Sequence, residues 1–433
     1  MSDTFIIKGG RPLSGVTDVR GSKNTATKMM IASLLTDEPC VIENTPFSAD
    51  VDITREICES IGSEVAFEDG HRCRIETGEI KTSVVSELSR RNRIPILALG
   101  PLLHRRGFAE VPVLGGCPIG HRPINFHVEA LTKMGVRIER RTNSYYAEAE
   151  RIRGAEIEFL YPSVGATENV ILCAVLAEGR TILRNAAVEP EILNLTEMLN
   201  AMGARISCDA KRREMVIDGV TRLRGITVRV MPDRNEIVSF ASAALATGGD
   251  ILVRGAGDSH LQMFLGSIRG IGGAFVVEED GIRFKGSGPY KGVEIETAPH
   301  PGFMTDWQQP FCVLLTQAEG PSIIHETVYE DRFGYVRDLK RMGADIDVSR
   351  DCPGARCRFF GQTFNHSVRI NGPRTLRGAE IAMTDIRAGI ALVIAALAAE
   401  GKSVITGVEH IDRGYEKIDE RLRALGADIK RLV

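Results

Sequence analysis

The sequence has no stretch of the kind that crosses a membrane and no basic cluster of the kind that binds nucleic acid. Its longest apolar runs, such as residues 390–399, fall well short of the roughly 20 residues that a membrane-spanning helix needs. The formal net charge is −3 and no Lys/Arg run is present, which argues against nucleic acid and membrane surfaces as partners. Residues 1–4 lack the basic region and apolar core of a signal peptide, so a cytoplasmic location is expected.

Sequence patterns typical of metal binding and of nucleoside triphosphate binding are also missing. Nine cysteines occur without a CxxC pair, and two of them, Cys173 and Cys312, lie in apolar runs typical of the core. Cys352 and Cys357 lie close together, but no second pair of matching spacing accompanies them. The sequence therefore predicts reduced thiols, no metal ion and no cofactor. The P-loop pattern GxxxxGK(S/T) is absent as well.

A pattern repeats six times along the chain. Each copy has a β-like run and then an amphipathic helix that ends in a hydrophobic residue, a glycine and a small residue, about 70 residues after the previous ending. The ending glycines are Gly62, Gly135, Gly203, Gly272, Gly343 and Gly426. In the third copy Ile192, Leu195 and Leu199 lie on one helix face. In the sixth, the same spacing predicts a helix from Tyr415 to Leu425.

The repeat predicts an α/β fold of two domains with three modules each, because 433 residues exceed one ordinary core. The joint falls near residues 229–234. The strand-like run at residues 5–8 precedes the first module and is expected to pack with the last modules. We therefore expect one domain of residues 1–22 and 231–433, and a second of residues 23–230. A cleft between two such domains is a natural ligand site.

One loop interrupts this pattern. Residues 114–123, LGGCPIGHRP, place three glycines, two prolines and the thiol of Cys117 beside His121 and Arg122. They lengthen the second copy, and long loops in compact modules are more often functional than not. Cationic neighbours favour the thiolate. The alternative is a solvent loop with an incidental cysteine.

Further candidates are single polar residues at element ends. Lys23 and Asn24 precede an expected helix at 26–35, where a lysine suits a phosphate or carboxylate; a surface lysine is the alternative. Asp306 lies in the Pro/Gly-rich segment 298–308 and is either a general base or a turn cap. Arginines offer paired donors to phosphate, although each is as readily a solvated or ion-paired side chain. The arginines in question are Arg93, Arg387 and Arg413.

Taken together, the motifs resemble those of the enolpyruvyl transferases, most closely the members that act on UDP-N-acetylglucosamine. The matching segments occur in family order along the whole chain. They are GSKN (21–24), DVD (50–52), ALGP (98–101), GGCPIGHRP (115–123), PSVGATEN (162–169), EPEI (189–192), PDR (232–234), PHPGFMTD (299–306), ETVYEDRF (326–333), TDIRA (384–388) and HIDRGYEKI (410–418).

The resemblance implies two inside-out α/β barrel domains, each of three repeated modules around buried helices, with a cleft between them. It implies transfer of the enolpyruvyl group of phosphoenolpyruvate to the 3-hydroxyl of UDP-N-acetylglucosamine, with release of phosphate and without a metal. This is the first committed step of peptidoglycan synthesis. The antibiotic fosfomycin is expected to alkylate Cys117.

The resemblance also assigns residues. Cys117 would donate a proton to the methylene carbon, and Asp306 would accept the proton of the acceptor hydroxyl. Phosphoenolpyruvate would be held by Lys23, Asn24, Arg122 and Arg413, with Cys117 beside it. The nucleotide sugar would be bound by Arg93, Arg122, Pro123, Ile124, Asn125, Phe126, Tyr161, Pro162, Ser163, Val164, Asp306 and Val328.

Three departures from the commonest family pattern concern the acceptor more than phosphoenolpyruvate. Asn125 replaces a usual Asp, Tyr161 stands where some members have Lys, and residues 235–238 read NEIV. They leave open a different nucleotide acceptor, as in antibiotic pathways. A catalytically silent homologue is disfavoured because four residues are all present: Lys23, Cys117, Asp306 and Arg413. A shikimate-pathway enzyme is disfavoured because that relative lacks the cysteine loop.

Overall fold

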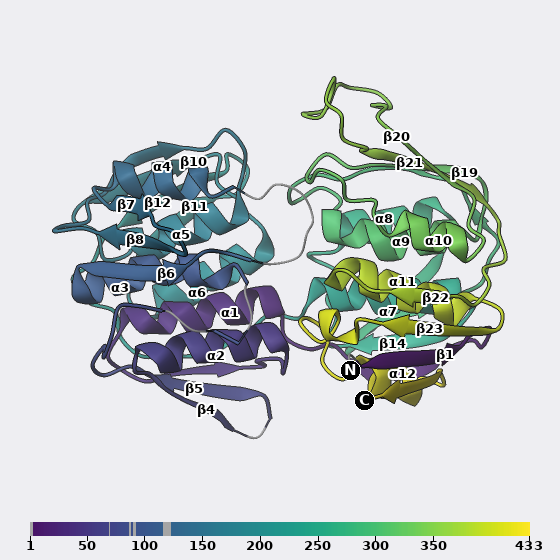
Figure 1. Cartoon of the computed structure of the whole chain (residues 1–433), viewed down its shortest axis with the longest axis horizontal. Helices are drawn as coiled ribbons and strands as arrows, with labels where there is room; N and C mark the ends of the chain where they lie inside the picture. The colour runs from purple at the N-terminus through teal and green to yellow at the C-terminus, as the bar shows by residue number, and fades with distance from the viewer. Residues whose placement is uncertain (1–2, 69, 86–87, 90–91, 116–122) are drawn as a thin grey trace. The chain divides into compact units, whose positions relative to one another are not determined.

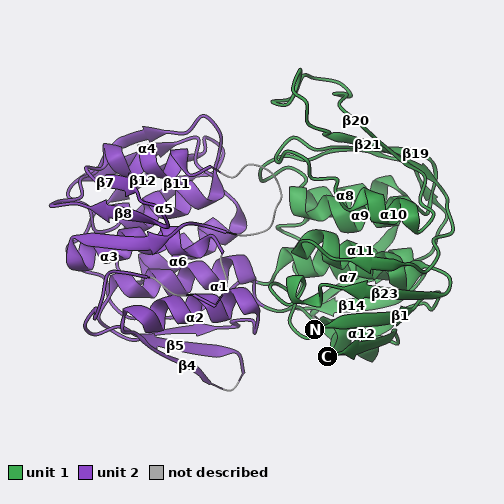
Figure 2. Cartoon of the chain, viewed as in Figure 1, with its two compact units in different colours: residues 1–20, 117–122, 232–433 green, residues 21–116, 123–231 purple. Residues whose placement is uncertain are grey.

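The chain forms two compact units, each with its own hydrophobic core (Figures 1 and 2). A computed structural model describes residues 3–68, 70–85, 88–89, 92–115 and 123–433. Among these residues, unit 1 comprises 3–20 and 232–433, and unit 2 comprises 21–115 and 123–231. Cys117 and Arg122 lie outside the described residues.

Unit 2 contains three small sheets. The first has the strand order β13 (Thr227–Arg229), β3 (Cys40–Glu43), β5 (Arg72–Glu76), β4 (Glu64–Glu68). The second has the order β6 (Phe108–Pro112), β8 (Ser144–Glu148), β7 (Arg137–Arg140). The third has the order β11 (Arg205–Asp209), β12 (Glu214–Asp218), β10 (Arg180–Arg184), β9 (Glu156–Glu158).

The helices of unit 2 lie beside these sheets. They are α1 (Lys23–Ala32), α2 (Ala49–Ile61), α3 (Leu99–Arg106), α4 (Asn125–Lys133), α5 (Val164–Ala174) and α6 (Pro190–Ala201), with short 3₁₀ turns η1 (Ser33–Leu35) and η2 (Ile94–Ala98). Helix α1 packs on α2 and α6, and α5 packs on α3 and α4. Nearly all of α5 is buried, including the polar side chains of Glu168 and Asn169.

Unit 1 repeats this arrangement with three more sheets. The first has the order β15 (Ala274–Val277), β16 (Gly281–Lys285), β14 (Asp250–Arg254), β2 (Ser14–Asp18). The second has the order β17 (Tyr290–Lys291), β19 (Ala318–His325), β21 (Ser367–Gly372), β20 (Ile346–Ser349), and β18 (Glu294–Glu296) also pairs with β19. The third has the order β22 (Glu380–Ala382), β23 (Lys402–Thr406), β1 (Thr4–Lys8), β24 (Asp428–Leu432).

Three helices form the centre of unit 1. The helices of the unit are α7 (Arg234–Ala246), α8 (Gln262–Gly270), α9 (Gln308–Leu315), α10 (Val336–Arg341), α11 (Ile386–Ala398) and α12 (Ile418–Ala424), with turns η3 (Thr305–Trp307) and η4 (Val408–His410). Helices α7, α9 and α11 pack against one another. They are buried on almost every side, as expected of helices that are apolar all round.

The sixfold repeat that the sequence predicts is confirmed. Each of the helices α2, α4, α6, α8, α10 and α12 is followed by its ending glycine and then by a strand. All six glycines have φ between 80° and 111°, as at Gly62 and Gly272. This left-handed conformation stops a helix and costs glycine little, because it has no Cβ. The local signal therefore sets the end of each module.

The N-terminal strand belongs to the sheet of the last module, as expected. Strand β1 pairs antiparallel with both β23 and β24, and Phe5 lies opposite Ile405 and Arg431. Figure 1 shows this purple strand among the yellow C-terminal elements. The following strand β2 pairs in parallel with β14 of the fourth module.

The helix of the sixth copy begins later than predicted by the sequence, which places its start at Tyr415. Helix α12 begins at Ile418, and Lys417 before it has φ of 44°, outside the right-handed helical region. Tyr415 is instead buried, and its hydroxyl contacts Ser239 and Arg387. Side-chain burial favours that position over a further helical turn.

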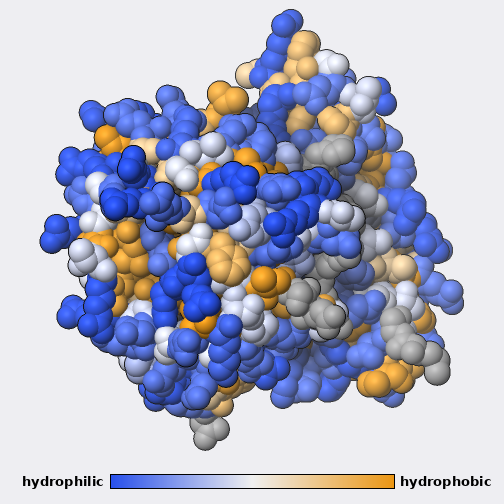
Figure 3. Space-filling view, turned by 60° about the vertical axis from the view of Figure 1, so that its left-hand side comes forward, coloured by the Kyte–Doolittle hydropathy of each residue, from blue (hydrophilic) through white to orange (hydrophobic). Residues whose placement is uncertain are grey.

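No helix in the described part of the chain is long and apolar enough to span a membrane. One face of the molecule is shown by hydropathy in Figure 3. Hydrophilic residues cover most of that face, and apolar residues form small separate groups, which is ordinary for a protein surface.

Candidate active site

A carboxylate held by two arginines lies at the start of the central helices of unit 1. Asp306 in η3 accepts from Arg332 at 2.6 Å through Oδ1, and from Arg387 Nε at 3.0 Å through Oδ2. Both arginines are almost fully buried, whereas Asp306 keeps 17% of its side chain exposed. Two guanidinium groups favour the ionised carboxylate. Asp306 is thus an anion held in place, with part of its side chain open to solvent.

Arg387 is fixed by the helix that begins beside it. The side chain of Asp385 caps α11 by accepting from the backbone N–H of Arg387 at 2.9 Å. The Arg387 guanidinium also donates to the Tyr415 hydroxyl at 3.0 Å, and that hydroxyl lies 2.8 Å from Ser239 Oγ. Burial works to lower the pKa of Arg387, but its electrostatic interactions with Tyr415 and Asp306 outweigh burial and raise the pKa. The arginine therefore stays charged.

A second buried carboxylate organises the backbone around Asp306. Glu326 accepts from Thr305 Oγ1 at 2.7 Å and from the backbone N–H groups of Val328 and Tyr329 at 2.7 and 3.0 Å. Complete burial raises the pKa of Glu326. The group ties the turn before Asp306 to the segment that begins at Val328, so two sequence-predicted residues are brought together by one that was not predicted.

In unit 2, Lys23 lies at the first position of α1. Its Nζ contacts Asp50 Oδ2 at 2.8 Å, and the two side chains are only 12% and 8% exposed. This excludes the alternative of a solvated surface lysine. Asn24 follows it and is half-buried. The helix start supplies backbone N–H groups of the kind that bind anions.

A buried ion pair lies one turn further along α1. Lys28 Nζ lies 3.8 Å from Glu168 Oε1 of α5, and both side chains are almost inaccessible. Burial raises the pKa of Glu168 to about 7, opposed by Lys28, and burial lowers the pKa of Lys28. Unit 2 thus contains ionisable groups of both signs near Lys23.

The predicted nucleotide-sugar residues of unit 2 gather around two helix starts. Helices α4 and α5 pack together, and Asn169 of α5 donates to His127 Nδ1 of α4 at 3.1 Å. Arg93, which precedes η2, is close enough to His127 for its charge to lower the pKa of that imidazole. Two helix N-termini and one guanidinium form an arrangement suited to an anionic group such as a diphosphate.

Individual positions in this group differ in exposure. Pro123, Asn125 and Val164 are exposed, whereas Ile124, Phe126, Tyr161, Pro162 and Ser163 are half-buried. Ser163 caps α5 by accepting from the backbone N–H of Ala166, and Phe126 packs on Phe159 with ring centroids 5.7 Å apart. The remaining predicted residues lie in unit 1: Val328 and Arg413 are half-buried. Arg413 follows η4 in the turn before α12.

His127 predicts a pH dependence of stability. Burial, with a smaller effect of Arg93, lowers its pKa from 6.5 to about 3. As the pH falls, His127 becomes protonated near pH 6.5 in the unfolded chain but stays neutral in the folded chain. The contribution of His127 to the free energy of unfolding is therefore present above pH 6.5 and lost toward pH 3. Between pH 7 and pH 5 the expected loss is about 2 kcal/mol.

Urea unfolding at both pH values tests this expectation. His127→Gln, whose amide oxygen can still accept from Asn169, should remove most of the pH-dependent loss. His260→Gln, at an exposed side chain, is the control and should leave the loss unchanged. An unaltered loss in His127→Gln would assign the acid sensitivity to other groups.

Two residues that organise the site, Glu326 and Arg332, were not assigned from sequence, and the partner of Arg387 was not predicted. Glu326 and Arg332 lie inside the motif ETVYEDRF, and Arg387 inside TDIRA, but nothing in the spacing shows that both arginines meet Asp306. The ion-paired reading of Arg387 is correct, and its partner is the candidate base itself. The motifs were the only signal available.

Comparison with known proteins identifies the family. The sequence pattern of the EPSP synthase (3-phosphoshikimate 1-carboxyvinyltransferase) family matches residues 7–422, and the chain belongs to this family of carboxyvinyltransferases. The chain is 45% identical to UDP-N-acetylglucosamine 1-carboxyvinyltransferase of Protochlamydia amoebophila over 99% of this chain and 94% of the relative. It is 42% identical to the enzyme of that name from Zymomonas mobilis, with 99% of each chain covered.

Solved structures share the fold. The enolpyruvyl transferase NikO from Streptomyces tendae superposes with a TM-score of 0.86 at 24% identity, covering 99% of both chains. EPSP synthase from Acinetobacter baumannii superposes with a TM-score of 0.75 at 18% identity, covering 100% of both chains. At such identities the likeness concerns the fold, and the sequence relatives carry the argument about activity.

Proposed function

We infer that this protein transfers the enolpyruvyl group of phosphoenolpyruvate to the 3-hydroxyl of UDP-N-acetylglucosamine and releases inorganic phosphate. The observation that carries this inference is full-length identity of 45% and 42% to two carboxyvinyltransferases named for that acceptor. The reaction is the first committed step of peptidoglycan synthesis and so belongs to cell-wall formation.

The charges of the site support an anionic substrate. Phosphoenolpyruvate carries a phosphate and a carboxylate, which several fixed cations must hold. In our proposal Lys23, Arg122 and Arg413 supply them, with Asn24 beside Lys23. Lys23 is suited to this role because it is almost buried at the start of a helix, where its charge adds to the helix dipole.

Proton transfer is assigned to two residues. Cys117 protonates the methylene carbon of phosphoenolpyruvate while the acceptor oxygen adds to the neighbouring carbon. Asp306 takes the proton of that hydroxyl, and loss of phosphate and a proton from the tetrahedral adduct restores the double bond. The support for Asp306 is its geometry: it is held as an anion by Arg332 and Arg387 and is partly exposed.

The acceptor is assigned to the group around the starts of α4 and α5. Arg93, Asn125, Phe126 and Ser163 belong to it, together with Pro123, Ile124, Tyr161, Pro162 and Val164; from unit 1, Asp306 and Val328 contribute. Helix N-termini and Arg93 suit the diphosphate of a nucleotide sugar.

A second acceptor is a candidate because of Asn125. This exposed first residue of α4 is an amide where a carboxylate is usual, which changes the charge offered to the nucleotide. An enzyme with this change would transfer the same enolpyruvyl group to another nucleotide.

Phosphate release separates these readings. The full chain is incubated with phosphoenolpyruvate and, in turn, UDP-N-acetylglucosamine, UDP and UMP, and inorganic phosphate is measured. We expect phosphate release only when UDP-N-acetylglucosamine is the acceptor. Release with a different nucleotide would replace the acceptor, and no release with any of them would favour a catalytically silent protein.

Fosfomycin is expected to form a covalent adduct with Cys117. Its epoxide is opened by a thiolate, and the neighbouring His121 and Arg122 favour that form of the cysteine. Intact-mass spectrometry should show one adduct per chain, which disappears in Cys117→Ala but persists in Cys208→Ala, at a half-buried thiol of unit 2. An adduct that survives Cys117→Ala would place the reactive thiol elsewhere.

A further inference from the structure

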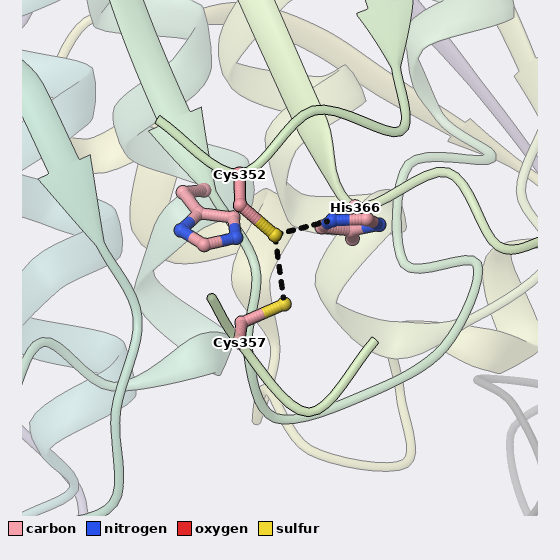
Figure 4. A group of neighbouring side chains, drawn as sticks. Cys352, Cys357 and His366 are labelled. Atoms are coloured by element: carbon pink, nitrogen blue, oxygen red, sulfur yellow. Dashed lines mark hydrogen bonds between the residues drawn. The ribbon is translucent and has the colours of Figure 1, made fainter. Parts of the chain in front are cut away.

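Four potential metal ligands meet in unit 1, although the sequence predicts no metal site. They are His325, Cys352, Cys357 and His366, and one donor atom of each lies within 4.8 Å of the others. Cys352 Sγ lies 3.5 Å from Cys357 Sγ and 3.3 Å from His366 Nε2 (Figure 4). The two cysteines lacked a second cysteine pair in the sequence because the missing ligands are histidines from β19 and from the residue before β21.

We propose that these four side chains bind a structural Zn²⁺ ion. Cys₂His₂ is a common zinc ligand set, and tetrahedral coordination with bonds of about 2.0–2.3 Å separates ligand atoms by roughly 3.3–3.8 Å. The two short distances given above already agree with this spacing. Two thiolates balance the charge of the ion, so the complete site is neutral. Four protein ligands leave no open position, which is typical of a structural site rather than a catalytic one.

The histidine hydrogen bonds prepare both imidazoles for a metal. His366 Nδ1 lies 2.9 Å from the Phe364 carbonyl oxygen, which only an N–H can satisfy, so a neutral ring keeps the lone pair on Nε2. His325 Nδ1 lies 2.9 Å from a Glu296 carboxylate oxygen, and the same reasoning applies. Such outer hydrogen bonds from carbonyl and carboxylate groups regularly orient zinc-bound histidines.

His325 Nε2 provides independent support. The His325 side chain is only 1% exposed, and its Nε2 has no hydrogen-bond partner among the described residues. A buried polar atom without a partner is costly, and a metal ion is one of the explanations for it. Around the thiols, the backbone N–H of Phe359 donates to Cys357 Sγ at 3.3 Å, a bond that stabilises a thiolate.

The loop that carries the cysteines gives the ion a structural role. Residues 350–366 connect β20 and β21 without helix or strand, and Figure 1 shows them as a long loop beyond those strands. Irregular loops longer than about 12–15 residues are uncommon in compact domains. Zinc would fasten this loop to the end of β19, next to Glu326, which holds the turn before Asp306.

Metal titration of the full chain tests the proposal. The protein is reduced with a phosphine, stripped of metal and titrated with zinc chloride against a chromogenic chelator. We expect one equivalent of zinc per chain. Cobalt(II) in place of zinc should give the visible bands of tetrahedral coordination and a thiolate-to-cobalt charge-transfer band.

Matched variants locate the ion. Cys357→Ser and His325→Gln should abolish stoichiometric uptake, whereas Cys208→Ser, at a half-buried thiol of unit 2, should not. Glu296→Gln should weaken zinc binding roughly 10–100-fold, because it removes the carboxylate behind His325. A chelator should lower the Tm of the zinc-loaded protein but not that of Cys357→Ser.

Three results would overturn the proposal. One is the absence of zinc uptake by the reduced, folded wild-type chain, a result that does not depend on whether any variant folds. Another is uptake that persists in Cys357→Ser and His325→Gln. The third is a disulfide between Cys352 and Cys357 that forms in air as readily with zinc as without. None of these readouts depends on enolpyruvyl transfer.

Discussion

Asp306→Asn is expected to lower kcat by about 10²–10⁴-fold, the usual contribution of a general base. Asparagine keeps the shape of the side chain but cannot take the proton of the acceptor hydroxyl at neutral pH. It also leaves Arg332 and Arg387, which are 2% and 6% exposed, without their shared carboxylate. We therefore expect a loss of stability as well, because buried charges without a partner are costly.

The control for Asp306→Asn must separate chemistry from stability. Asp345→Asn is suited to this purpose, since Asp345 also pairs with an arginine of unit 1, Arg374, but at an exposed position. Rates are compared per folded chain, with folding checked by circular dichroism and urea titration. If folded Asp306→Asn retained kcat within threefold of wild type, Asp306 would be a structural ion-pair partner only.

Lys23→Met is expected to lower kcat/KM for phosphoenolpyruvate by about 10²–10³-fold, the loss typical of removing one preorganised charge from an anionic transition state. Methionine preserves most of the side-chain volume and removes the ammonium group. The KM for UDP-N-acetylglucosamine should change less than threefold, because the acceptor is assigned to other residues. Initial rates with each substrate varied in turn measure both quantities.

The ion pair of Lys23 with Asp50 offers a control within the site. Lys23→Met alone leaves the nearly buried Asp50 without its 2.8 Å partner and should destabilise the chain. Lys23→Met with Asp50→Asn should recover stability without recovering activity. Lys23→Arg should recover part of the activity, since a guanidinium keeps the charge. Equal activity of wild type and the double variant would remove Lys23 from phosphoenolpyruvate binding.

The helices of this protein and their ends can be predicted from residues that are close together in the sequence. The apolar spacing from Ile192 to Leu199 and the glycine at 203 predict helix α6 and its end, and the structure agrees. Such signals need only a few adjacent residues, because helix periodicity and a positive φ are properties of short segments. These local signals failed at Tyr415, which the spacing placed in the last helix. Its buried hydroxyl accepts a hydrogen bond from Arg387, and α12 begins only at Ile418.

The family of the protein was also determined by sequence, because its motifs occur in order from residue 21 to residue 418. The motifs named Asp306 but did not show what holds it. That depends on which helix starts meet: η3, the turn before α10 and the start of α11 converge only when α7, α9 and α11 pack together.

The same reason explains the four potential zinc ligands. Spacing along the chain predicted no metal site at Cys352 and Cys357, because a zinc pattern is recognised only when its ligands are close in sequence. His325 and Ser367, the neighbour of His366, are paired across β19 and β21. The sequence by itself determined the modules, their boundaries and the family. Only the tertiary structure decided which charged and ligating side chains meet, because strand pairing and helix packing join residues that are far apart in the chain.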